Sequence, residues 1–87
     1  KLPAPERLAY FLLQLARIYE TQMGEQPPLH LHLTRQQIAE NLGLTIETVS
    51  RSFTKLKNDN LIALIGCDTV VILDPGKLAR MATLATV

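Results

Sequence analysis

The chain has 87 residues, enough for one small domain with a modest core. Its hydrophobic fraction of 47% favours a folded chain over a disordered one, and its net charge of +1 is low for a nucleic-acid binder. No apolar run approaches the roughly 20 residues needed to cross a bilayer, and no secretion leader is visible. A single cysteine excludes an internal disulfide and fits a reducing cytoplasm.

The first predicted element is a helix over residues 6–22. Residues 1–5 contain two prolines and predict a hinge, although Pro5 is also tolerated in a first helical turn. Because the chain begins with Lys1 rather than Met, we expect a fragment of a longer protein. Apolar residues at helical spacing predict a buried stripe of Leu8, Phe11, Leu12, Leu15, Ile18 and Tyr19. Gly24 and the two prolines at 27–28 predict a loop after the helix.

Strict alternation of Leu and His predicts a short strand over residues 29–33, with His30 and His32 on one face. Two histidines at this spacing are able to bind a metal ion. No cluster of Asp, Glu or Cys lies nearby in the sequence, so we favour a solvent-facing strand surface and predict no metal site.

Residues 34–57 predict two helices joined by a tight turn. Thr34 begins the first helix and Gln37 lies three residues later, as a capping box requires. Gly43 allows the positive φ that a sharp turn needs, and Thr45 is able to cap the second helix. The inward-facing residues are predicted to be Ile38, Ala39 and Leu42 in the first helix and Val49, Phe53 and Leu56 in the second, which runs to about Asn58.

The charge of this segment differs from that of the rest of the chain. Residues 34–57 hold four basic and two acidic side chains, a net charge of +2, which leaves −1 for the remaining residues. This asymmetry favours a nucleic-acid partner. A solvated helical surface alone also produces it.

Two β-rich runs follow, at residues 61–65 and 69–73, and the three residues between them predict a hairpin turn. Asp74 followed by Pro75 predicts the start of a last helix. Its apolar stripe is Leu78, Met81, Ala82, Leu84 and Ala85.

The order of these elements predicts one domain over residues 1–87. It is a mainly α fold with a small antiparallel β-sheet, a winged helix-turn-helix. Residues 34–57 form the helix-turn-helix and residues 61–73 form the wing.

Three side chains on the second helix suit the edges of base pairs, because the first two turns of such a helix reach into the major groove. Glu47 can accept a hydrogen bond from the cytosine amino group, and Arg51, one turn later, matches the two acceptors of guanine. Ser50 can donate or accept, and its small size allows close approach. The alternative for Glu47 and Arg51 is an exposed salt bridge at i,i+4 spacing, and the two interpretations are compatible.

Helix starts suit phosphate, because they expose amides and a partial positive charge. The candidate phosphate contacts are Thr34, Arg35, Gln36, Thr45 and Thr48, with Lys55 and Lys57 as weaker candidates late in the second helix. The alternative for each of these residues is capping or plain solvation.

The predicted wing turn carries Cys67 and Asp68. A carboxylate at this position should weaken the approach of the wing to phosphates. We hypothesise that oxidation of Cys67 adds negative charge and bulk and weakens DNA binding. An incidental or structural cysteine is the favoured alternative.

Several motifs together resemble the DNA-binding domain of the CRP/FNR family of bacterial transcription regulators. The segments Leu-Thr-Arg-Gln-Gln-Ile-Ala (33–39) and Leu-Gly-Leu-Thr-Ile-Glu-Thr-Val-Ser-Arg (42–51) carry the resemblance. Residues 5–13 are similar to the first helix of that domain. The pattern Glu-x-x-Ser-Arg at 47–51 is similar to the FNR and FixK branch.

The resemblance implies a homodimer that reads an inverted repeat of a TTGAT-like half-site and acts on RNA polymerase. It assigns Glu47, Ser50 and Arg51 to base edges, and Thr34, Arg35 and Gln36 to phosphate. It also implies an N-terminal sensor and dimerisation region, after which residues 1–5 form a hinge. The effector, or an iron–sulfur cluster where one is present, belongs to that region, and no cofactor is expected in this chain.

The sequence also allows two rival functions to be weighed against DNA binding. A winged helix used purely for protein contacts predicts no salt-dependent affinity for DNA. An enzyme is disfavoured, because Ser50, the histidines and the acidic residues show no nucleophile–base arrangement.

Overall fold

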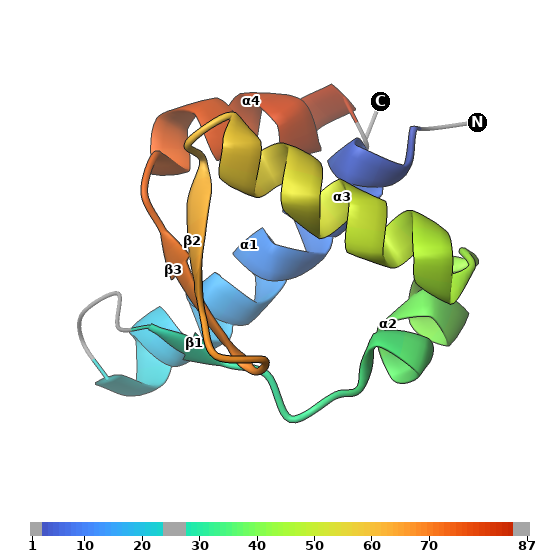
Figure 1. Ribbon diagram of the computed structural model, residues 1–87. Coiled ribbons are helices and arrows are strands. Elements are labelled where there is room, and N and C mark those ends of the chain that lie inside the picture. Colours follow the sequence, from blue (N-terminus) through green and yellow to red (C-terminus); the bar gives the residue numbers. More distant parts are fainter. Residues whose placement is uncertain (1–2, 24–27, 85–87) are drawn as a thin grey trace.

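The described residues form four helices and a small antiparallel sheet (Figure 1). A computed structural model describes residues 3–23 and 28–84. The elements are α1 (Ala4–Met23), β1 (Leu29–His30), α2 (Arg35–Leu42), α3 (Ile46–Asn58), β2 (Ile62–Ile65), β3 (Thr69–Ile72) and α4 (Pro75–Leu84). The strand order is β1-β3-β2. This arrangement confirms the predicted winged helix-turn-helix.

Helix α1 begins at Ala4, two residues before the predicted start. Pro5 therefore lies in the first helical turn and not in a hinge. In that turn its missing N–H costs no helical hydrogen bond. The first two residues of the predicted hinge lie outside the described residues, as do Gly24, Pro27 and Ala85.

The buried stripe of α1 follows the prediction except near its end. Leu8, Leu12 and Phe11 are buried, whereas Ile18 is 52% exposed and its assignment to the stripe was wrong. The small residues Ala9 and Ala16 complete the buried surface instead, which turns it away from Ile18. The side chain of Tyr19 is among those not described.

Strand β1 is shorter than the predicted strand over residues 29–33, because the chain leaves the sheet to enter α2. Leu29 pairs with Val70 and His30 with Thr69. The predicted alternation persists as far as His32, since Leu29 and Leu31 are buried whereas His30 and His32 are exposed. It was wrong for Leu33, which is 37% exposed.

The wing is the β2–β3 hairpin, closed by the turn at residues 66–68. Its register pairs Ile65 with Thr69 at the turn and Ile62 with Ile72 at the open end. The Leu31 N–H donates to the Asp68 carbonyl at 2.6 Å, which ties the wing turn to the connector between β1 and α2.

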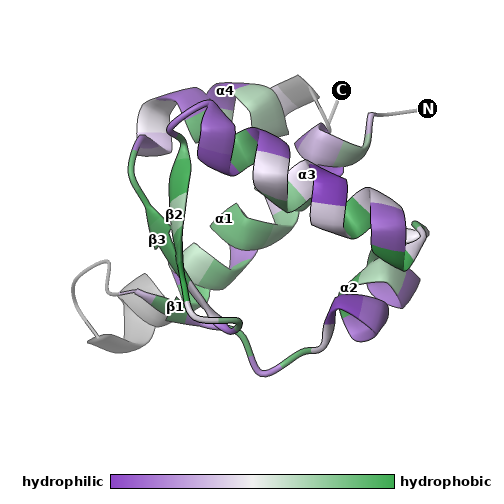
Figure 2. Cartoon of the chain, viewed as in Figure 1, coloured by the Kyte–Doolittle hydropathy of each residue, from purple (hydrophilic) through white to green (hydrophobic). Residues whose placement is uncertain are grey.

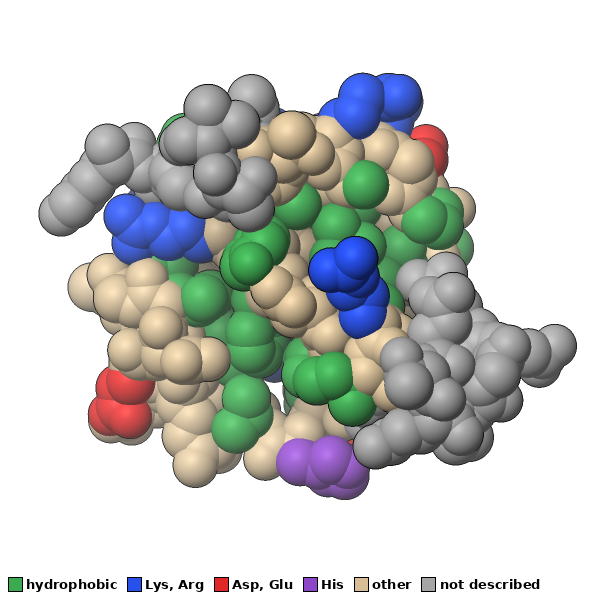
Figure 3. Space-filling model, turned by 180° about the vertical axis from the view of Figure 1, so that it is seen from behind, with side chains coloured by type: hydrophobic (Ala, Val, Ile, Leu, Met, Phe, Trp, Pro, Cys, Tyr) green, Lys and Arg blue, Asp and Glu red, His purple; other side chains and the backbone are tan. Residues whose placement is uncertain are grey.

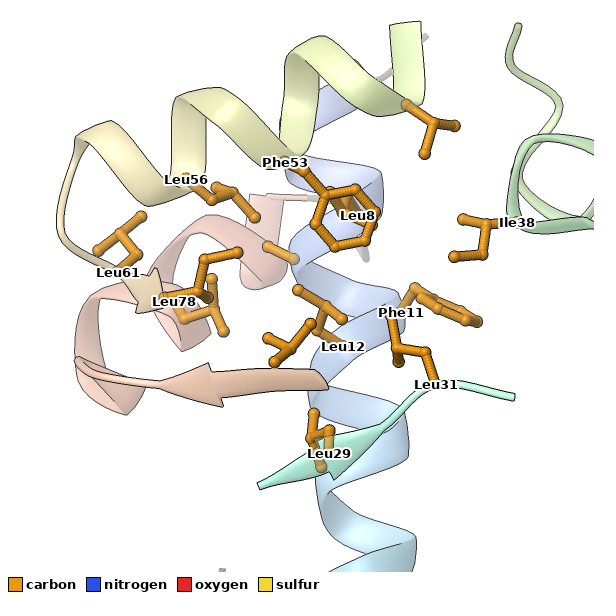
Figure 4. Close-up of a cluster of buried hydrophobic side chains, with 14 of the residues drawn as sticks. Leu8, Phe11, Leu12, Leu29, Leu31, Ile38, Phe53, Leu56, Leu61 and Leu78 are labelled. Atoms are coloured by element: carbon orange, nitrogen blue, oxygen red, sulfur yellow. The ribbon is translucent and has the colours of Figure 1, made fainter. Parts of the chain in front are cut away.

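One hydrophobic core joins the four helices and the sheet. Among its fully buried members are Leu8, Leu12, Leu29, Ile38, Val49, Leu56, Ile62, Val70 and Leu78. Figure 4 shows side chains from these elements converging on one cluster. In Figure 2 the strands β2 and β3 are mostly hydrophobic, while hydrophilic residues lie along α2 and α3. The helix-turn-helix therefore presents a polar surface on a rigid base.

Some hydrophobic side chains stay on the surface. On α1, Tyr10 is 39% exposed, in addition to Ile18. Figure 3 shows that hydrophobic side chains are open to solvent on the face opposite the view of Figure 1.

Candidate nucleic-acid interface

The two helices of the motif begin and turn at the predicted residues. The Thr34 hydroxyl accepts a hydrogen bond from the Gln37 N–H at 3.1 Å, and the Gln37 side-chain oxygen accepts one from the Thr34 N–H at 2.9 Å. These two bonds form the predicted capping box. Gly43 then adopts a left-handed conformation with φ of 70°, which ends α2 and redirects the chain into α3.

Helix α3 presents one polar face and buries the other. Glu47, Ser50 and Arg51 are all exposed. The buried residues of the helix are Val49, Ser52, Phe53 and Leu56. Because an α-helix advances about 100° per residue, these three residues lie on the side away from the buried stripe. They are the predicted contacts with base edges and are called the reading residues below.

The side chains of Glu47 and Arg51 form no ion pair with each other or with another described residue. An ion pair on the same helix and just beyond its end joins Lys55 to Asp59 instead. The salt-bridge alternative therefore does not hold in this structure. A carboxylate acceptor and a guanidinium donor are both left open to a ligand.

Two further residues of α3 share the exposed surface and were not predicted as contacts. Ile46, the first residue of the helix, is 47% exposed beside Glu47. Thr54 is exposed one turn after Ser50, and its hydroxyl donates to the Ser50 carbonyl at 3.1 Å. Their positions on this face could have been predicted from their spacing, since residues three and four apart share a helix face.

The start of α3 is capped by a chain of hydroxyl groups. The Thr45 hydroxyl oxygen accepts from the Thr48 N–H at 3.1 Å, and the same hydroxyl donates to the Thr48 hydroxyl oxygen at 2.8 Å. The pair of hydroxyl groups therefore uses one hydrogen within the protein and keeps the other for an acceptor outside the chain.

Arg35, the first residue of α2, contacts the side of α3. Its guanidinium carbon is 4.0 Å from the centre of the Phe53 ring, a cation–π contact. Phe53 belongs to the buried side of α3, so this contact places the start of α2 against the middle of α3.

The remaining predicted phosphate contacts have local partners. The Gln36 side-chain amide donates to the Glu40 carboxylate at 3.5 Å. Lys55 Nζ lies 3.1 Å from Asp59 Oδ2, and both side chains are about half exposed. Exposed pairs of this kind contribute about 0.2–1 kcal/mol, so Lys55 is easily drawn to a stronger anion. Its contact with phosphate stays a prediction.

The wing turn lies beside the start of α2. A hollow of about 450 Å³ separates the two, and Leu31, His32, Leu33, Thr34, Arg35, Cys67 and Asp68 line it. Cys67 is an exposed free thiol. The Asp68 carboxylate accepts a hydrogen bond from the Thr69 hydroxyl at 3.2 Å. The proposed redox role of Cys67 stays a prediction.

The described residues contain neither a metal-binding cluster nor a membrane-spanning helix. No group of three or more His, Cys, Asp and Glu side chains there is arranged to hold a metal ion. His30 Nδ1 instead lies 3.2 Å from the Thr69 hydroxyl oxygen, a hydrogen bond across the sheet. No helix in that part of the chain is long and apolar enough to cross a membrane.

Comparison with known proteins places this interface in a family. Residues 6–81 match the family model for a Crp-like helix-turn-helix domain. The chain is 48% identical over 78 residues to the nitrogen fixation regulation protein FixK of Rhizobium meliloti, covering 90% of this chain and 35% of that protein. It is 39% identical over 82 residues to the transcriptional activator Anr of Pseudomonas protegens, covering 94% of this chain and 33% of that protein.

Solved structures agree with the sequence comparisons. FixK2 of Bradyrhizobium japonicum superposes with a TM-score of 0.77 at 29% identity, over 90% of this chain and 37% of that one. The CO-dependent transcription factor CooA of Carboxydothermus hydrogenoformans gives a TM-score of 0.74 at 29% identity, over 91% of this chain and 36% of that one. The chain thus spans about a third of the length of these relatives.

Proposed function

Because this chain belongs to the CRP/FNR family of transcription regulators, we propose that it binds duplex DNA with α3 in the major groove and reads a TTGAT-like half-site. One observation carries this proposal. Glu47 and Arg51 lie one turn apart on the exposed side of a capped helix, without an ion-pair partner among the described residues. Side chains held in this way meet base edges at no cost of breaking a salt bridge.

The proposed readout centres on the G·C pair of the half-site. The Arg51 fork donates to the two acceptors of guanine, and the Glu47 carboxylate accepts from the amino group of its cytosine. Ser50 lies beside Arg51 and bonds a neighbouring base, and the exposed Ile46 contacts a thymine methyl group. Each good bidentate contact contributes about 1–3 kcal/mol of discrimination against the wrong base.

The proposed anchors hold the backbone of the DNA without reading its sequence. They are Thr34, Arg35, Gln36, Thr45, Thr48 and Lys55, which lie at the two helix starts and late in α3. The two threonines at the start of α3 keep one hydroxyl hydrogen between them for a phosphate oxygen. These contacts set the register of α3 along the groove.

Two partners belong to the full-length protein. We propose that it acts as a homodimer on an inverted repeat, because two-fold symmetric proteins read two half-sites about one helical turn apart. RNA polymerase is the proposed protein partner. A single chain reads one half-site, so its affinity is expected to be lower than that of the dimer.

A binding titration tests the readout. The chain is titrated with a TTGAT palindrome and with a scrambled duplex at several salt concentrations. Arg51→Ala should abolish the preference for the palindrome. Arg35→Ala should weaken both affinities and flatten the salt slope, as expected for a lost phosphate contact.

The matched control for charge is Lys57→Ala, which removes one exposed cation from the far end of α3 and should keep the preference. A preference that survives Arg51→Ala contradicts the assignment of the base contacts. An absence of any salt-dependent affinity in the unaltered chain would instead support a winged helix used for protein contacts.

A further inference from the structure

The carboxyl end of α2 is held by a side chain from α1. The last carbonyl groups of a helix have no partner within the helix. Here the N–H groups of Gly43 and Leu44 both donate to the Ala39 carbonyl, which lies almost one turn before the Leu42 carbonyl. Arg7 Nη1 donates to that Leu42 carbonyl at 3.0 Å in a partly buried position. A residue 35 positions earlier in the sequence thus completes the end of the helix.

The chemistry of this contact suits an arginine. The carboxyl end of a helix carries a partial negative charge, and a charged donor makes a stronger hydrogen bond than a neutral one. The guanidinium also lies against the turn itself, since a Cβ atom on Gly43 would be 3.9 Å from Arg7 Nη1. Arg7 therefore donates a hydrogen bond to the last carbonyl of α2 and lies next to the glycine at which the chain turns.

Helix α2 depends on such external contacts for its orientation. It has eight residues, too few to be stable alone, and its buried side chains are Ile38 and Ala39. At its amino end Arg35 lies on Phe53 of α3. At its carboxyl end Arg7 holds the Leu42 carbonyl. The amino end of α2 is thus joined to α3 through its own Arg35, and its carboxyl end is joined to α1 through Arg7.

We propose that Arg7 is a positioning residue for DNA recognition. By holding the turn after Leu42, it sets the angle between α2 and α3, so that the anchors on α2 and the reading residues on α3 meet the duplex together. Arg7 itself does not touch the DNA in this proposal. The inference rests on the proposed function, because it assigns Arg7 a role in the readout made by α3.

The test is Arg7→Met in the 87-residue chain, which removes the donor and keeps much of the apolar length. The ratio of affinities for the TTGAT palindrome over the scrambled duplex should fall by about tenfold, within the range of about twofold to thirtyfold that such couplings span. The salt slope should stay the same, because no phosphate contact is lost. Arg7→Lys should restore part of the ratio, since an ammonium group also donates to a carbonyl.

A matched control removes the same charge elsewhere. Arg80→Met on α4 takes away an exposed arginine outside the helix-turn-helix and should leave the ratio unchanged. An unchanged ratio in Arg7→Met overturns the proposal. A salt slope that falls by about one also overturns it, because Arg7 would then be a phosphate contact.

Amide hydrogen exchange gives a readout independent of DNA. The Leu44 N–H, bonded to the Ala39 carbonyl at 2.8 Å, should exchange faster in both Arg7 variants, while the Val49 N–H inside α3 keeps its rate. Equal acceleration of both amides means a general loss of stability and rejects a positioning role. If the unaltered chain shows no preference for the palindrome, the proposed function fails, while the exchange data still report whether Arg7 holds the turn.

Discussion

At the scale of single residues, the helix-turn-helix depends on one backbone conformation. Gly43 has φ of 70°, where a residue with a side chain is strained. A Cβ atom added there would make only an ordinary contact, 3.9 Å from Arg7 Nη1. The requirement for glycine is therefore one of backbone torsion and not of space.

The backbone torsion of Gly43 gives a prediction for the stability of a variant with a side chain at this position. Gly43→Ala should lower the free energy of unfolding by about 1–2 kcal/mol, because only the left-handed conformation is penalised. Urea denaturation measures the change. Gly76→Ala is the matched control, since Gly76 lies in the first turn of α4 without a positive φ and a Cβ atom would be 3.7 Å from an Asp74 oxygen. It should stabilise the chain by up to about 1 kcal/mol, and destabilisation of equal size in both variants would refute the torsional explanation.

The structural roles of some single residues could be predicted from the sequence, and those of others could not. Thr34, Gln37, Gly43 and Thr45 took their predicted places, because caps and turns are set by neighbours in the sequence. The contact of Arg7 with Leu42 could not be predicted in this way. It joins residues 35 positions apart and depends on how α1 crosses the motif.

At the scale of elements, α3 is defined by its cap and its packing. Thr45 satisfies the Thr48 N–H, and the buried stripe holds the helix on the core. The stripe was predictable from its helical period. The length of β1 was not, because alternation alone does not show where a chain leaves its sheet, and the pairing of β1 ends at His30.

Removal of the cap gives the prediction for this element. Thr45→Ala should destabilise the chain by about 1 kcal/mol, because the Thr48 N–H loses its acceptor and the first turn of α3 frays. Thermal unfolding followed by circular dichroism measures the change. Thr54→Ala, which removes a mid-helix hydroxyl bonded to the Ser50 carbonyl, should stay within about 0.5 kcal/mol. A loss in Thr54→Ala that matches the loss in Thr45→Ala would argue against capping as the cause.

At the scale of the whole molecule, one core supports the entire interface. Leu12 of α1 is fully buried and lies within the cluster of Figure 4. The apolar spacing of α1 predicted this residue and Ile18 alike, yet the structure buries one and exposes the other. The apolar period shows which face of a helix is buried. How far along and around the helix the buried face extends depends on the elements that pack against it.

This difference can be measured. Leu12→Ala should lower the free energy of unfolding by about 2–5 kcal/mol, because it leaves a cavity between packed elements. Ile18→Ala, at a site that is 52% exposed, should change it by less than about 0.5 kcal/mol. Chemical denaturation of both variants checks the pair, and a large loss in Ile18→Ala would show that this surface is covered in solution.

The wing turn has one practical consequence. Cys67 is the single cysteine of the chain, and its thiol is exposed. The carbonyl of the next residue, Asp68, accepts a hydrogen bond from the Leu31 N–H, which ties the wing turn to the connector between β1 and α2. A fluorescent or spin label attached to Cys67 needs no removal of other thiols. It would report the distance between the wing and a labelled duplex from a nearly fixed point of attachment.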